Sequence, residues 1–67
     1  MKNMYDVQQL LKRFGIFIYV GNRTADLELM EMEVRELYQS GCIQIQEYQQ
    51  AVLILKKEIR LAKSERE

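Results

Sequence analysis

The side chains of this 67-residue chain that could carry chemistry are carboxylates, one thiol and a set of cations near aromatic rings. Acid–base catalysis requires paired carboxylates in a dry cleft. The candidate carboxylates are Asp26, Glu28, Glu31, Glu33 and Glu36. They form a charge run of the kind that normally faces water on a helix. Cys42 has no histidine to activate it, because the chain contains none. The sequence therefore predicts a protein that is not an enzyme.

The charges are unevenly distributed, although they sum to zero. Residues 1–23 hold four bases and one acid, and residues 24–47 hold six acids and one base. Residues 48–67 hold five bases and three acids. Within this last segment, Lys56, Arg60 and Lys63 recur at steps of four and three, with Lys57 beside them. That spacing predicts a basic stripe along one side of a helix.

Cations that follow a phosphate backbone, together with aromatic faces on which bases stack, are what sequence-tolerant binding of single-stranded nucleic acid requires. If the basic stripe lies near the cations of the first segment, all of them share a surface with aromatic side chains. One hypothesis is therefore a module that binds single-stranded DNA or RNA. Its candidate contacts are Lys12, Arg13, Phe17, Tyr19, Arg23, Lys56, Lys57, Arg60 and Lys63.

The alternative hypothesis is a module that binds a protein partner or a second copy of itself. In the third predicted helix, apolar residues at alternating steps of three and four form a seam. Three further apolar residues, Leu53, Ile54 and Leu61, lie off that seam. Because residues 51–55 are apolar all the way round, the helix is either central in the bundle or contacts another chain.

Three helices must position these side chains, over about residues 3–14, 23–40 and 45–63. Asn3 caps the first helix, and Gly15 ends it in a left-handed conformation. Gly41 ends the second helix, and Glu47 reaches back to the amide at the start of the third. The fold class is therefore all-α, a small three-helix bundle in one domain.

Residues 16–20 are β-branched or aromatic and lie between two glycines, which on local grounds predicts a buried strand. The chain offers no convincing second strand to pair with it. We interpret the segment as an extended or single-turn apolar connector that packs across the helices. A strand that pairs between two copies of the chain is the alternative.

Composition limits the remaining classes. A chain of this length buries only about 60% of its unfolded surface, which suffices for one small core. The longest apolar runs have five residues, against the roughly 18 that a membrane span needs. The N-terminus lacks the apolar stretch of a secretory signal, so we expect a cytoplasmic protein. With no histidine and a single cysteine, we expect neither a metal site nor a cofactor.

The sequence resembles a known family over nearly its whole length. The similarity is carried by residues 5–11, 14–15, 17–19, 25–30, 36–38, 47–48 and 53–55, together with Gly21 and Arg23. It resembles the YqgQ-like family of small cytosolic proteins from Bacillus-like Firmicutes. The resemblance implies a three-helix bundle, and a single-stranded nucleic-acid role is proposed for the family from its fold. It brings no catalytic positions to carry over.

Overall fold

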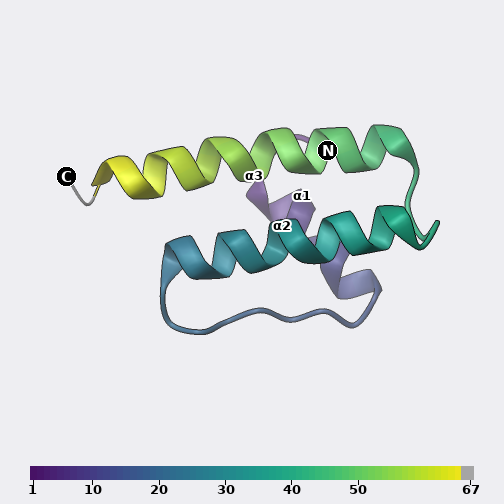
Figure 1. Ribbon diagram of the computed structural model, residues 1–67, viewed down its shortest axis with the longest axis horizontal. Helices are drawn as coiled ribbons and strands as arrows, with labels where there is room; N and C mark the ends of the chain where they lie inside the picture. Colours follow the sequence, from purple (N-terminus) through teal and green to yellow (C-terminus); the bar gives the residue numbers. More distant parts are fainter. Residues whose placement is uncertain (66–67) are drawn as a thin grey trace.

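The computed structural model describes residues 1–65, which form three helices: α1 (Met4–Arg13), α2 (Arg23–Gln39) and α3 (Ile45–Glu65). In Figure 1, α2 and α3 lie side by side and antiparallel, and α1 crosses them. The all-α fold class is confirmed, with no strand among the described residues. The predicted bounds hold within two residues, the largest difference being α3, which continues past Lys63 to Glu65.

Local signals in the sequence fix the ends of α1. The Asn3 side chain accepts a hydrogen bond from the Asp6 amide at 3.1 Å, which caps the first turn. Gly15 has a φ of 73°, and the Ile16 amide then donates to the Leu11 carbonyl at 3.0 Å. The chain therefore leaves α1 abruptly and turns back along α2.

A tight turn joins α2 to α3. Gly41 has a φ of 76°, and the Cys42 amide donates to the Leu37 carbonyl at 2.8 Å. The Gln44 amide donates to the Glu47 carboxylate at 3.2 Å, which confirms the predicted half of a capping box. Tyr38 and Tyr48 stack across the turn with ring centroids 4.6 Å apart. These contacts set the start of α3 against the end of α2.

The core lies between the three helices. Its fully buried large side chains are Leu27, Leu55, Val7 and Val34, contributed by all three helices. None of the helices in the described part of the chain is long and apolar enough to cross a membrane.

The connector, residues 16–20, runs back beside α2 as an extended chain between Gly15 and Gly21 (Figure 1). Ile16 and Ile18 are half-buried against the core, whereas Phe17 and Tyr19 are exposed. Hydrogen bonds hold both ends, from the Ile16 amide to Leu11 and from the Val20 amide to the Asp26 carboxylate at 2.7 Å. The predicted extended connector packed across the helices is confirmed.

Candidate binding groove

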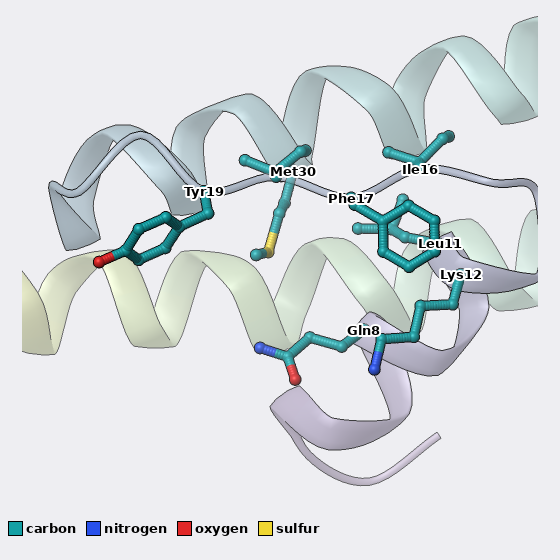
Figure 2. Close-up of a pocket in the computed structure, with 8 residues that line it drawn as sticks. Gln8, Leu11, Lys12, Ile16, Phe17, Tyr19 and Met30 are labelled. Carbon is teal, nitrogen blue, oxygen red and sulfur yellow. The ribbon is translucent and has the colours of Figure 1, made fainter.

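A hollow of about 420 Å³ lies between α1, α2 and the connector, and we call it the connector groove. Figure 2 shows Phe17 beside Leu11 and Lys12, and Tyr19 at the opposite end. The lining residues are Gln8, Leu11, Lys12, Ile16, Phe17, Ile18, Tyr19 and Met30. Three of the nine predicted nucleic-acid contacts, Lys12, Phe17 and Tyr19, therefore meet in one place.

Simple periodicities place these side chains. Gln8 and Lys12 are four residues apart on α1, so they extend from the same face of that helix. Phe17 and Tyr19 are two residues apart on an extended chain, so they point to the same side. They are 75% and 87% exposed, which leaves their ring faces available to a ligand.

A second hollow, of about 310 Å³, continues from the connector groove toward the start of α2. It shares Gln8, Ile18, Tyr19 and Met30 with the first and adds Arg23 and Asp26 to the lining. The Arg23 guanidinium donates to the Glu58 carboxylate at 2.9 Å, so part of its charge is already compensated. The extended groove thus has Lys12 at one end and Arg23 at the other.

The other predicted cations lie elsewhere. Arg13 pairs with Glu47 at 3.3 Å, on the α1 side of α3. Lys56 pairs with Glu31 of α2 at 3.1 Å. Arg23 pairs with Glu58, which lies two residues after Lys56 on α3. Because successive residues of a helix are rotated by about 100°, the side chains of Lys56 and Glu58 point about 160° apart. The structure therefore divides the cations into separate groups instead of joining them in one surface.

The basic stripe of α3 has surroundings of its own. Lys56, Arg60 and Lys63 surround a hollow of about 280 Å³ with Ile59. Lys56 and Lys63 also line a neighbouring hollow that contains Glu28 and Glu31 of α2, whose carboxylates oppose an anionic ligand. Lys57 is exposed and lies four residues from both Leu53 and Leu61. The stripe is therefore a mixed-charge surface, separate from the connector groove.

The predicted partner-contact residues of α3 also divide. Leu53 is 72% exposed and Leu61 is 45% exposed, two helical turns apart. Ile54 is half-buried and packs against the core. Of the three predicted residues, Leu53 and Leu61 are therefore exposed on this helix, as is Ile45 at its start.

Three of the side chains that line the connector groove are polar. Its polar groups are an amide, an ammonium group and a phenol, from Gln8, Lys12 and Tyr19. Cys42 is exposed in the turn between α2 and α3, away from the groove. Over residues 1–65, no group of three or more metal-ligating side chains gathers closely enough to hold a metal ion.

Comparison with known proteins places the chain in a family. The YqgQ-like family model matches residues 1–61. The chain belongs to the YqgQ-like family. It is also 40% identical over all 67 of its residues to the uncharacterized protein YqgQ of Bacillus subtilis (strain 168), of which the match covers 94%. The resemblance drawn from the sequence motifs is confirmed.

In this YqgQ-like chain, the sequence reasoning missed two features of the groove. Gln8 was not among the predicted contacts, although its spacing of four from Lys12 places both side chains on one face. Met30 belongs to the core, and it also lines the groove beneath the connector (Figure 2), which the sequence did not indicate. A search for polar residues one helical turn from each predicted cation would have found Gln8.

Proposed function

We propose that this protein is a non-enzymatic binding module that holds single-stranded nucleic acid along the connector groove. The observation that supports the proposal most is the meeting of two exposed aromatic rings with an ammonium group in one hollow. Aromatic faces accept any base by stacking, and a nearby cation pairs with the phosphate backbone. In this proposal Phe17 and Tyr19 stack on bases, while Lys12 and Arg23 contact phosphates.

The proposed surface is smaller than the sequence suggested. Arg13, Lys57 and the basic stripe of α3 lie outside the groove, and Arg13 and Lys56 already pair with carboxylates. One or two phosphate contacts remain. Because each contact contributes about 0.7 to the log–log salt slope for single strands, we expect a shallow slope of about 0.7 to 1.4. Most of the affinity then comes from stacking.

Replacing Lys12 with glutamine tests the phosphate contact. Fluorescence anisotropy of labelled oligo-dT and oligo-U, titrated at several salt concentrations, gives the slope. We expect saturable binding by the natural protein and a slope lower by about 0.7 in Lys12→Gln. Lys57→Gln is the matched control, since it removes the same charge from an exposed site outside the groove. Absence of binding at low salt, or equal effects of the two variants, would refute the proposal.

A second candidate function is self-association through the outer face of α3. The observation in its favour is the exposure of Leu53 and Leu61 on one helix. Fully burying an exposed leucine is worth about 1.5–3 kcal/mol, and Leu53 and Leu61 would gain the share of this that corresponds to their exposed surface. We expect Leu53→Asp to lower the sedimentation-derived mass to that of one chain if this face is the interface. A mass unaffected by Leu53→Asp removes this candidate.

A further inference from the structure

The middle of the connector has unpaired backbone groups. Within residues 1–65, neither the amides nor the carbonyls of residues 17–19 take part in a hydrogen bond. The segment is nevertheless held in place, because the Ile16 and Val20 amides on either side bond to Leu11 and Asp26. It is therefore an extended segment anchored at both ends, with its hydrogen-bonding groups free.

The direction of these groups follows from the geometry of an extended chain. Backbone groups of successive residues point to opposite edges, so those of every second residue share an edge. The amides of Ile16 and Val20 bond to the protein, so those of Phe17 and Tyr19 point to the other edge. On this edge, Phe17 and Tyr19 together offer two N–H and two C=O groups. One neighbouring strand can form hydrogen bonds with all four.

We propose that this edge pairs antiparallel with the connector of a second copy of the chain. The inference goes beyond the proposed nucleic-acid function. Pairing centred on Ile18 is two-fold symmetric, and it sets Phe17 of one copy opposite Tyr19 of the other. The backbones of each opposed Phe17 and Tyr19 then form two hydrogen bonds with each other, and their rings contact across the strands.

The composition of the connector favours a second copy of the chain as the occupant. Residues 14–22 carry no charge and no proline, so two connectors approach without repulsion and without a missing donor on the free edge. Residues 16–20 are β-branched or aromatic throughout, the types that favour pairing as strands. A partner with a charged strand would gain no complementary charge from this segment.

The contact made by this pairing is small. At their exposures, Phe17 and Tyr19 offer roughly 300 Å² per copy, or about 600 Å² between two copies. A stable interface buries about 1,200–2,000 Å². The dimer is therefore weak and forms reversibly at high protein concentration. It covers the same rings as the proposed nucleic-acid ligand, so the two compete.

A proline substitution tests the backbone pairing. Tyr19→Ala removes the ring and keeps the N–H group, whereas Tyr19→Pro removes both and suits an extended chain. Sedimentation equilibrium from low micromolar to millimolar protein measures dimerisation of the natural chain and both variants. Two hydrogen bonds are lost per dimer in Tyr19→Pro, so we expect its dimerisation to be about tenfold or more weaker than that of Tyr19→Ala. Circular dichroism checks that both variants remain helical.

The outcomes separate this inference from the proposed function. Oligonucleotide binding depends on the Tyr19 ring, so Tyr19→Ala and Tyr19→Pro should weaken it equally, and only dimerisation should distinguish them. A single-chain mass at every concentration overturns the inference. So does equal dimerisation of the two variants, or a dimer that Leu53→Asp abolishes and Tyr19→Pro leaves intact.

Discussion

Replacing Leu55 with alanine is expected to lower the free energy of unfolding by about 2–5 kcal/mol. Leu55 is fully buried on α3, within the cluster formed by all three helices. Removing its side chain loses apolar burial and leaves a cavity that the surrounding side chains fill only partly. A chain of this length has a total stability of roughly 3–10 kcal/mol, so the change removes a large share of it. Urea denaturation followed by circular dichroism measures the loss.

Leu53→Ala is the matched control for Leu55→Ala. It makes the same chemical change two residues away on the same helix, at a side chain that is mostly exposed. We expect it to change the free energy of unfolding by less than about 0.5 kcal/mol. A loss as large as that of Leu55→Ala would contradict the assigned faces of α3. If that loss grew with protein concentration, it would show that a second copy covers Leu53.

Replacing Phe17 and Tyr19 together with alanine is expected to weaken oligonucleotide binding by about 2–6 kcal/mol, or roughly 30-fold at least. Each ring that stacks on a base contributes about 1–3 kcal/mol, and the proposal assigns one base to each ring. Because both rings are largely exposed, the double variant should retain its helical fold. Anisotropy titration at constant low salt measures the change.

Leu53→Ala serves again as the control for the double variant, because Leu53 is an exposed apolar side chain outside the connector groove. It should bind oligonucleotides as the natural chain does. If Phe17→Ala/Tyr19→Ala binds with unchanged affinity, the bases do not lie in the connector groove. Stacking would then have no part in any affinity that the natural chain shows.

The sequence by itself determined the helices and where they end. Asn3 caps α1 through a hydrogen bond to an amide three residues away, and Gly15 ends it within the next turn. Gly41 and Glu47 specify the turn between α2 and α3 in the same way. All these interactions join residues within a few positions of one another. A pattern along the chain is therefore enough to predict them, and the apolar periodicity adds the buried face of each helix.

Only the tertiary structure decided which charged side chains meet. Arg13 and Glu47 are 34 residues apart in the chain, and Arg23 and Glu58 are 35 apart. Whether such side chains pair depends on how the helices cross and on their rotation about their own axes. Periodicity gives the spacing of cations along one helix but not the helix that lies opposite. For this reason, the cations that were predicted to share one surface lie in separate groups.

The connector depends both on the local sequence pattern and on tertiary packing. Its alternation of inward and outward side chains is local, and the sequence predicted an extended segment. The hydrogen bonds that fix it, to Leu11 of α1 and to Asp26 of α2, depend on helices at either end of it. The groove beside it exists because α1 crosses next to the connector, so that Gln8 and Lys12 line the same hollow as Phe17 and Tyr19. The residues of the site were thus present in the sequence, and packing between distant segments determined which of them form it.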